Sequence, residues 1–317
     1  MIASSPRVLQ VPLKFEVSAR VLWAPALRLE VSEGGVGRVG GPVDSPAPPR
    51  ESLPPEIDGY LMRSLPVNSR QPQLRFVDGW LRYIPAQYPR YYVDLGQKFE
   101  EYCAKFSSKS RSTIRRKVRK FAKMSGGEVQ WRVYTTPHEL TEFYALARQV
   151  SEKTYQERLL GQGLPDTEIF RAGMLTLAEQ DQARGFILFC GEQPISYLYC
   201  PVREGTVLYQ YLGYDPAFSA YSPGTVLHWF VFQHLFGEGQ HRLFDFSEGY
   251  GEHKKFFATG SQLCANVFFL RRTPGMVALI LVHMGFDRIT ARGAALLDKV
   301  GLGRRVRALF RFGGGAA

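Results

Sequence analysis

The sequence of 317 residues has little cysteine and no long apolar run. Its four cysteines show no CxxC spacing, which argues against a disulfide framework and against a zinc site and fits a reducing compartment. The longest apolar run, Met276 to Met284, is far below the roughly 18 residues that a membrane-spanning helix needs. The N-terminus has no apolar core segment, so we expect no signal peptide and a cytoplasmic protein.

Acidic residues are the minority among the charged ones. Lysine and arginine number 40 against 29 aspartates and glutamates, a formal net charge of +11. Such a balance favours anionic partners: phosphorylated cofactors, acidic glycans, nucleic acid or anionic lipid surfaces. With 45% hydrophobic and 13% aromatic residues, the chain can bury a core, which excludes a disordered protein.

The first hundred residues predict short strands and turns. Residues 35–40 match GxGxxG, but four prolines follow by position 49. Because no helix can open there to bind a dinucleotide, we interpret residues 34–50 as a loop or linker. Residues 55–100 are rich in aromatics and broken by prolines, which is typical of strands joined by turns. We assign residues 1–104 to an N-terminal lobe.

A strongly basic helix is predicted next. Residues 105–123 hold nine basic residues and no acid, with Ile114, Val118 and Phe121 at helical spacing. Ser107 or Ser110 is expected to cap its start. The cations form either a solvated face or an anion-binding surface. Because nucleic-acid readers usually interleave exposed aromatics with the charge, we do not expect this helix to read bases.

Helices and strands follow in a regular α+β order. Residues 129–134 predict a strand, and Thr136 opens a helix with a capping box and a proline at its first position. A second helix is expected after Asp166. Residues 185–190, 195–200 and 207–214 predict three strands in an antiparallel meander, because the turns between them are short.

A buried helix and two strands complete this pattern. Ser222 is the predicted N-cap of a helix that is apolar nearly all round, with Pro223 at its first position and Gly237 as its stop. Residues 242–246 and 264–270 predict the last strands, on either side of a short helical segment.

Several ordered motifs carry a resemblance to a known family. They are the serine- and arginine-rich stretch 107–116, Lys153-Thr-Tyr-Gln, Gly213-Tyr-Asp-Pro with Ser222-Pro-Gly-Thr, and Asp245-Phe-Ser-Glu-Gly with Lys254-Lys-Phe-Phe. Over roughly residues 55–272 the chain resembles the GNAT acyltransferases associated with cellulose and exopolysaccharide synthesis, which are similar to the Fem-type aminoacyltransferases. The resemblance implies an α+β GNAT fold, a mixed and mostly antiparallel sheet flanked by helices.

The same resemblance implies a domain order and shows two departures. It suggests a degenerate N-terminal GNAT-like lobe and a catalytic lobe over residues 105–272. The usual glycine-spaced pyrophosphate loop is missing before Ser222, and His253 stands where the family has a tyrosine. The first departure affects how CoA would bind, and the second affects which group would donate a proton.

The start of the buried helix is the predicted donor site. A helix N-terminus has unpaired amides and a positive dipole, so it attracts phosphate. Gly224 would let the phosphate approach, Thr225 adds a hydroxyl, and Ser222 begins the turn. The resemblance adds Tyr211 on the preceding strand and acyl-CoA, typically acetyl-CoA, as the co-substrate. The plain alternative is a well-capped core helix.

The segment after residues 242–246 is the predicted catalytic site. A carboxylate near the acceptor can take a proton from an attacking amine or hydroxyl. Glu248 is our first choice for this base and Asp245 the second, with Tyr250 as a proton donor. The resemblance assigns Lys254 to the acyl donor or the acceptor, with Lys255 facing solvent. The alternative is that these are solvated loop residues.

Other polar residues complete the expected site. Tyr155 and Gln156 would line the acceptor pocket, or instead end a helix packed on the core, and Arg111 or Arg115 would hold an anionic group. His228 is expected to be a satisfied core histidine, as is His234. No carboxylate or cysteine stands at ligand spacing to them, so we predict no metal.

Residues 273–317 predict helices, with apolar residues at helical spacing such as Met276, Ile280 and His283, and again Leu296, Leu297, Val300 and Leu302. They would pack on the domain or lie on a membrane surface, peripherally at the inner face.

The predicted function is transfer of an acyl group from acyl-CoA to an amine or hydroxyl of a small acceptor, a sugar or glycan precursor. One alternative is a Fem-like enzyme that uses aminoacyl-tRNA, the only case in which nucleic acid would be a partner. The other is a non-catalytic GNAT scaffold that binds acidic polymer or membrane.

Overall fold

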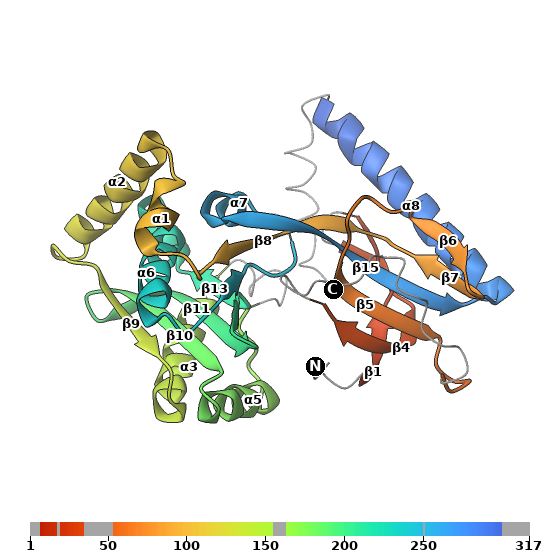
Figure 1. Cartoon of the computed structure of the whole chain (residues 1–317), viewed down its shortest axis with the longest axis horizontal. Coiled ribbons are helices and arrows are strands. Elements are labelled where there is room, and N and C mark those ends of the chain that lie inside the picture. Colours follow the sequence, from red (N-terminus) through yellow and green to blue (C-terminus); the bar gives the residue numbers. More distant parts are fainter. Residues whose placement is uncertain (1–6, 18–19, 35–52, 155–162, 250, 300–317) are drawn as a thin grey trace, which may run out of the picture. The chain divides into compact units, whose positions relative to one another are not determined.

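The computed structural model describes residues 7–17, 20–34, 53–154, 163–249 and 251–299 (Figure 1). The chain divides into two compact units, residues 90–261 and a unit that combines residues 1–89 with 262–317. This division differs from the predicted boundaries after residues 104 and 272, because the N-terminal strands share a sheet and a core with the C-terminal stretch. The GxGxxG stretch at 35–40 lies outside the described residues.

A mixed sheet forms the first unit. Its strands run in the order β1-β4-β5-β15-β7-β6, and all neighbours are antiparallel except the parallel pair β4 and β5. The bounds are Arg7–Pro12 for β1, Ala26–Glu33 for β4, Gly59–Pro66 for β5, Gly260–Arg271 for β15, Trp80–Tyr83 for β7 and Leu74–Val77 for β6. The short strands β2 (Phe15–Val17) and β3 (Arg20–Trp23) form a separate antiparallel pair.

A single helix, α8 (Pro274–Lys299), covers one face of this sheet. Alternate residues of a strand point to opposite faces, so Phe268 of β15 packs with Ile280 and Met284 of α8, whereas Phe269 packs in a different cluster with Trp80. Packing of this segment is therefore confirmed up to residue 286. Among the second set of predicted apolar residues, Leu296 is exposed, and the side chain of Leu297 and residues 300 and 302 lie outside the description.

The second unit has the predicted α+β fold. Its sheet runs β8-β14-β12-β11-β10-β9, with β13 paired to β11, and β12 and β14 are the parallel neighbours. The bounds are Gln87–Asp94 for β8, Leu243–Asp245 for β14, Thr206–Leu208 for β12, Gln193–Arg203 for β11, Ala183–Cys190 for β10, Gln130–Tyr134 for β9 and Tyr211–Tyr214 for β13.

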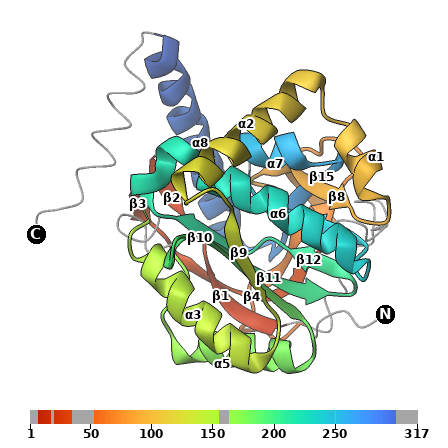
Figure 2. The ribbon, with the colours of Figure 1, turned by 90° about the vertical axis from the view of Figure 1, so that its left-hand side faces the viewer.

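Helices cover both faces of this sheet (Figure 2). On one face lie α3 (Pro137–Ser151) and α5 (Glu168–Glu179), which bury Phe143 and Met174. On the other lie α1 (Phe99–Ala104), α2 (Ser108–Met124), α6 (Pro223–Glu238) and α7 (Glu252–Phe257), around a core rich in phenylalanine. None of the helices described has the length and apolar character needed to span a membrane.

Local sequence signals act as predicted at several helix ends. The side chain of Ser107 accepts a hydrogen bond from the Ser110 amide and caps α2. Thr136 and Glu139 form the predicted capping box of α3. The stripe of α2 faces inward, since Ile114 and Phe121 are buried and Val118 is half-buried against the same core.

Two predictions for the region around α6 were wrong. The strand predicted over residues 207–214 is broken at Tyr209 and Gln210, because the Tyr209 amide bonds to the Asp245 carbonyl while the Gln210 amide bonds to Tyr199 on the other neighbour. Helix α6 continues through Gly237 to Glu238, and Gly239 is its C-cap, with a φ of 64° that suits the end of a helix.

Gly213 of β13 has little room for an added methyl group. A Cβ there would lie 2.4 Å from the Tyr197 ring and 2.9 Å from Thr154. We expect Gly213→Ala to lower the free energy of unfolding by about 1–3 kcal/mol, because overpacking forces neighbouring side chains to shift. Urea denaturation measures this loss.

Gly224 is the matched control, since its added Cβ would meet Leu212 at 3.7 Å, an ordinary contact. Gly224→Ala should change the free energy of unfolding by less than about 1 kcal/mol. Equal losses in the two variants would show that the packing at Gly213 is not the cause.

Candidate functional site

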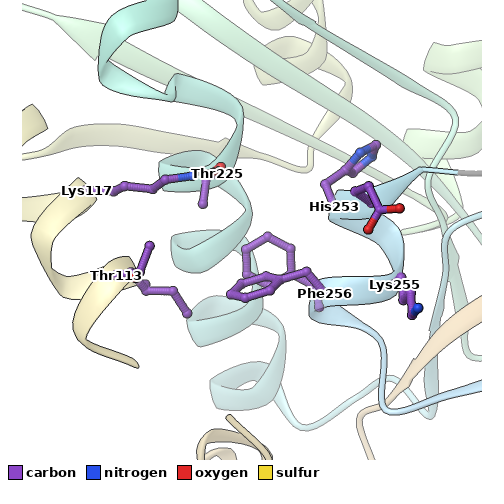
Figure 3. A pocket seen from close by; sticks show the side chains of 9 residues that line it. Thr113, Lys117, Thr225, His253, Lys255 and Phe256 are labelled. Carbon is purple, nitrogen blue, oxygen red and sulfur yellow. Dashed lines mark hydrogen bonds between the residues drawn. The ribbon is translucent and has the colours of Figure 1, made fainter. Parts of the chain in front are cut away.

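A pocket of about 540 Å³ lies between α2, the start of α6 and α7 (Figure 3). Its wall is contributed by three helices: Thr113, Ile114 and Lys117 from α2, Thr225 from α6, and Glu252, His253, Lys255, Phe256 and Phe257 from α7. The pocket thus combines two ammonium groups, two hydroxyls, an imidazole and one carboxylate with an apolar wall. Such a lining suits a ligand that has both an anionic and an apolar part.

Lys117 reaches the pocket because α2 is anchored by its buried stripe. Thr113 and Lys117 are one helical turn apart, so they share a face, and the Lys117 ammonium donates a hydrogen bond to the Thr225 hydroxyl over 3.3 Å. Burial lowers the pKa of Lys117, and the charge of Arg116 lowers it further. An anion bound beside this ammonium would relieve that cost.

The backbone at the start of α6 offers fewer free amides than predicted. Ser222 has a left-handed φ of 55° and its side chain makes no capping hydrogen bond, because this residue also ends a preceding 3-10 helix, η2 (Pro216–Tyr221). Its carbonyl accepts the amides of Thr225 and Val226, and Pro223 has no N–H. In the described part of the chain, Gly224 alone in this turn keeps an unbonded amide.

Strand alternation separates two of the predicted donor residues. Gly224 faces β13 through Leu212 and Tyr214. Tyr211 points to the opposite face of that strand, where its ring contacts Phe170 of α5 at 5.4 Å. The structure therefore does not bring Tyr211 together with Thr225, and Tyr211 belongs to the core under α3 and α5.

Lys254 of α7 is buried beside the segment after β14. Its ammonium donates to the Glu248 carbonyl over 2.8 Å and lies 5.4 Å from the centre of the Tyr209 ring. Burial lowers the pKa of Lys254 to about 8, with Arg90 acting in the same direction and the carboxylates of Asp245 and Glu248 opposing. This lysine changes charge close to neutral pH.

Asp245 is committed to an ion pair. Its fully buried carboxylate accepts two hydrogen bonds from the Nε of Arg90, at 2.9 and 3.0 Å, and lies 2.9 Å from an Nη of the same arginine. It also accepts the Ser247 amide. Removing one member of a buried pair is costly, so this geometry favours a structural role for Asp245 over the predicted role of base.

Glu248 remains the candidate base. It is exposed in the segment between β14 and α7, where Ser247 and Gly249 both have positive φ values, 56° and 98°. In this segment the Glu248 carbonyl accepts a hydrogen bond from the Lys254 ammonium. Tyr250, Tyr155 and Gln156 lie outside the described residues.

The predicted arginines of α2 lie away from the pocket wall. Burial raises the pKa of the Cys103 thiol in α1, Glu100 adds to the rise, and the charges of Arg111 and Arg115 oppose it. Both arginines therefore lie on the side of α2 toward α1, whereas Lys117 and Thr113 face α7. Lys255, expected to face solvent, is exposed but also lines the pocket.

Tyr209, His228 and His253 form a cluster near the pocket that the sequence did not predict. The Tyr209 hydroxyl lies 3.4 Å from Nε2 of His253, and the Tyr209 ring stacks on His228 with centroids 5.6 Å apart. Burial raises the pKa of Tyr209, while burial and the charge of Lys254 lower that of His253. These directions keep Tyr209 protonated and His253 neutral at neutral pH. Tyr209 reaches this place through the unpredicted break between β12 and β13.

His228 is buried as predicted but only half satisfied. Its Nδ1 lies 2.6 Å from the Gly224 carbonyl, while Nε2 has no hydrogen-bond partner among the described residues. Burial lowers its pKa to about 4, and the ring stacks on Phe257 at 5.4 Å. It is therefore a neutral ring that donates its Nδ1 proton to the helix start.

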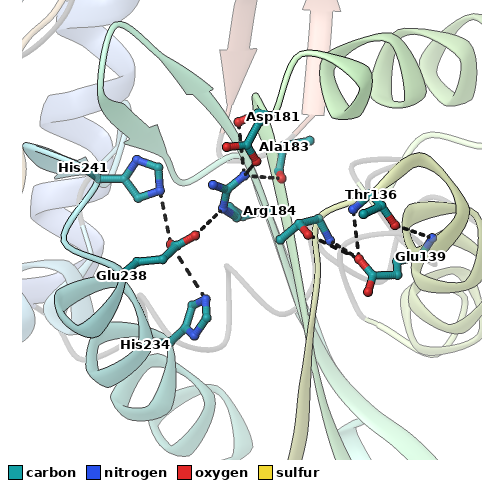
Figure 4. A network of polar contacts seen from close by, with 9 residues as sticks. Thr136, Glu139, Asp181, Ala183, Arg184, His234, Glu238 and His241 are labelled. Atoms are coloured by element: carbon teal, nitrogen blue, oxygen red, sulfur yellow. Dashed lines mark hydrogen bonds and ion pairs between the residues drawn. The ribbon is translucent and has the colours of Figure 1, made fainter.

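A second polar cluster lies at the C-terminal end of α6 (Figure 4). The buried Arg184 of β10 pairs with Glu238 at 3.1 Å and with Asp181 at 2.7 Å. Glu238 also faces His241 at 3.3 Å and His234 at 3.7 Å. The cluster ties the end of α6 to the sheet. No group of three or more potential ligands suited to a metal ion occurs within the described ranges.

Comparison with known proteins supports the fold assigned to this unit. A sequence model of the acetyltransferase (GNAT) domain matches residues 108–255, and no curated protein sequence matches the chain. Among solved structures, the chain is similar to L-PGS from Bacillus licheniformis, with 15% identity, 71% of this chain and 72% of that chain covered, and a TM-score of 0.47. The chain is also similar to FemX, with 11% identity, 71% of this chain and 75% of that chain covered, and a TM-score of 0.44.

A GCN5-related N-acetyltransferase from Kribbella flavida is less similar. The identity is 10%, the match covers 59% of this chain and 60% of that chain, and the TM-score is 0.33. At these identities and TM-scores the likeness says nothing about substrates. The matched residues include α2, the whole sheet from β9 to β14, the start of α6 and the pocket residues of α7 up to Lys255. Residues 108–255 of this chain match the GNAT domain model, in agreement with the α+β GNAT fold of this unit.

Proposed function

We propose that residues 90–261 transfer an acyl group from acyl-CoA to an amine or hydroxyl of a small acceptor, and that the pocket between α2, α6 and α7 binds the CoA. The observation that carries the proposal is the lining of this pocket, with Lys117 and Thr225 hydrogen-bonded at the start of a helix. The GNAT domain match over residues 108–255 supports it.

The chemistry of the pocket fits the two parts of CoA. Lys117 and Lys255 supply positive charge for phosphates, as does the dipole of α6 at Thr225. Ile114, Phe256 and Phe257 supply apolar surface for the uncharged arm. Since the helix start has few free amides, side chains from α2 and α7 would replace the missing pyrophosphate loop of the family.

The proposed reaction is direct attack on the thioester. The acceptor nitrogen or oxygen forms a bond to the acyl carbon, the bond from that carbon to sulfur breaks, and the CoA thiolate leaves. Glu248 would take the proton of the attacking group. The pair formed by Tyr209 and His253 would return a proton to the thiolate, which accounts for a histidine where the family has a tyrosine.

The acceptor class follows from the sequence resemblance. Proteins of the branch that this chain resembles are associated with cellulose and exopolysaccharide synthesis, so we propose a sugar or glycan precursor as the acceptor. Lys254, buried beside Glu248, would supply positive charge to the acyl donor or to an anionic acceptor.

One observation favours the aminoacyl-tRNA alternative. The outer face of α2 exposes Arg115, Arg116 and Arg119, which suits a polyanion. If tRNA binds tightly at low salt and reversal of these three arginines to glutamate abolishes both binding and activity, that alternative replaces ours. A non-catalytic scaffold would show neither CoA binding nor turnover.

Lys117 provides the test of the donor site. Lys117→Gln should raise the Kd for CoA about tenfold or more, because hydrogen bonds to charged groups contribute about 1.5–3 kcal/mol. Titration calorimetry measures this Kd. Arg119→Gln, on the same helix but exposed and outside the pocket wall, is the matched control and should leave the Kd within about twofold. An unchanged Kd in the Lys117 variant would remove CoA from this pocket.

Glu248 provides the test of catalysis. Glu248→Gln should lower kcat by about 10², the typical contribution of a general base, measured as CoA thiol released from acetyl-CoA with a panel of amino sugars. Its thermal stability should not change, since the side chain is exposed. Asp245→Ala should instead lower the free energy of unfolding by about 3–5 kcal/mol, because it leaves Arg90 buried without its partner. A stable, inactive Asp245 variant with a fully active Glu248 variant would reverse the two assignments.

Lys254 predicts a pH dependence. A lysine is charged below its pKa, so with a pKa of about 8 the positive charge is present at neutral pH and is lost as the pH rises through 8. We expect kcat/KM to fall above that pH. Lys254→Arg should lack this fall, because arginine keeps its charge throughout. The same fall in both proteins would assign it to another group.

A further inference from the structure

Helix α8 of the first unit has a second apolar face that nothing in the described chain covers. Val282, Ile289 and Leu296 are 59%, 72% and 64% exposed. They are spaced by seven residues, or two helical turns, so they form one line along the helix. The line lies opposite Ile280 and Met284, which pack on the sheet. An ordinary surface helix would carry polar residues here.

The charges on this outer face are positive. Arg288 and Arg292 are exposed. Arg292 lies one helical turn from both Ile289 and Leu296, and Arg288 lies one turn before Arg292. Between Ala278 and Leu296 the one acidic residue is Asp287, and its carboxylate lies 3.3 Å from His283 on the packed side. The outer face therefore combines aliphatic side chains with arginines and lacks an acid among its described side chains.

The pair of strands β2 and β3 extends this surface. Phe15 of β2 contacts His283 and Phe286 of α8, with centroids 4.7 and 5.5 Å apart, and Trp23 of β3 at 4.8 Å. The strands therefore lie against α8. Leu22 and Trp23 are themselves 57% and 54% exposed. Tryptophan and arginine are the side chains that suit the boundary between water and lipid, because each has an apolar body and a polar end.

The shape and charge of this surface favour one kind of binding partner over the others. Fourteen residues separate Val282 from Leu296, about 21 Å at ~1.5 Å per residue, so the apolar line suits an extended surface better than a small ligand. A second copy of the chain would bring another net charge of +11 and the same arginines against Arg288 and Arg292, which disfavours self-association. An anionic lipid surface complements both the charge and the apolar line.

We infer that the outer face of α8, with β2 and β3 beside it, binds peripherally to an anionic lipid surface. The aliphatic side chains and Trp23 would enter the boundary between headgroups and acyl chains, while Arg288 and Arg292 contact lipid phosphates. This inference stands independently of acyl transfer, because it concerns the first unit and a different set of residues.

Co-sedimentation of the full chain with vesicles tests this surface. The protein should sediment with vesicles that contain phosphatidylglycerol and not with pure phosphatidylcholine. Changing Val282, Ile289 and Leu296 together to glutamine should reduce the partition coefficient at least tenfold. Val8→Gln with Leu9→Gln, exposed apolar residues on strand β1, is the matched control and should leave it unchanged. Arg288→Gln with Arg292→Gln should lose about fivefold per arginine.

Three results would overturn the inference. The first is vesicle binding by the triple variant at the wild-type level while its melting temperature is also unchanged. The second is equal binding to phosphatidylcholine alone. The third is a wild-type dimer in light scattering that the triple variant converts to monomer, without vesicle binding by either, which would assign the face to a second copy. The CoA titration of Lys117→Gln is unaffected by any of these outcomes.

Discussion

The buried ion pair between Arg90 and Asp245 organises the second unit. Asp245 ends β14, and Arg90 lies on β8, the neighbouring strand. The same aspartate holds the Ser247 amide with its side chain and the Tyr209 amide with its carbonyl. One residue thus joins three segments at the edge of the proposed site. A buried charge needs such a complete set of partners, because an unpaired one is expensive.

Around this ion pair, aromatic packing sets the positions of the reactive groups. Tyr209 leaves the sheet where the strand breaks, stacks on His228 and meets His253. His228 in turn donates to the Gly224 carbonyl, which couples the stack to the start of α6. Lys254 is buried beside this stack, which lowers the pKa of its ammonium, and that ammonium donates a hydrogen bond to the Glu248 carbonyl.

Much of the fold was predictable because its signals are local. The caps at Ser107 and Thr136, the stripe of α2 and the apolar α6 depend on residues within a few positions of one another. The site depends on pairs that are distant in sequence. Lys117 and Thr225 are 108 residues apart, and Arg90 and Asp245 are 155 apart. No periodicity predicts such pairs, so Lys117 and Tyr209 were missed. The left-handed φ of Ser222 also escaped prediction, because serine is a common N-cap.

The division of the chain has a consequence for the order of synthesis. Residues 90–261 are inserted within the first unit, whose N-terminal strands β4 and β5 need β15 and α8 to cover their apolar residues. On the ribosome, the second unit emerges whole before β15 and α8 are made. The second unit can therefore fold while apolar residues of the N-terminal strands are still exposed, among them Leu29, Val31 and Leu61. Domains generally fold as units, and incompletely covered strands are prone to aggregate, so the N-terminal strands are open to aggregation until β15 and α8 have been made.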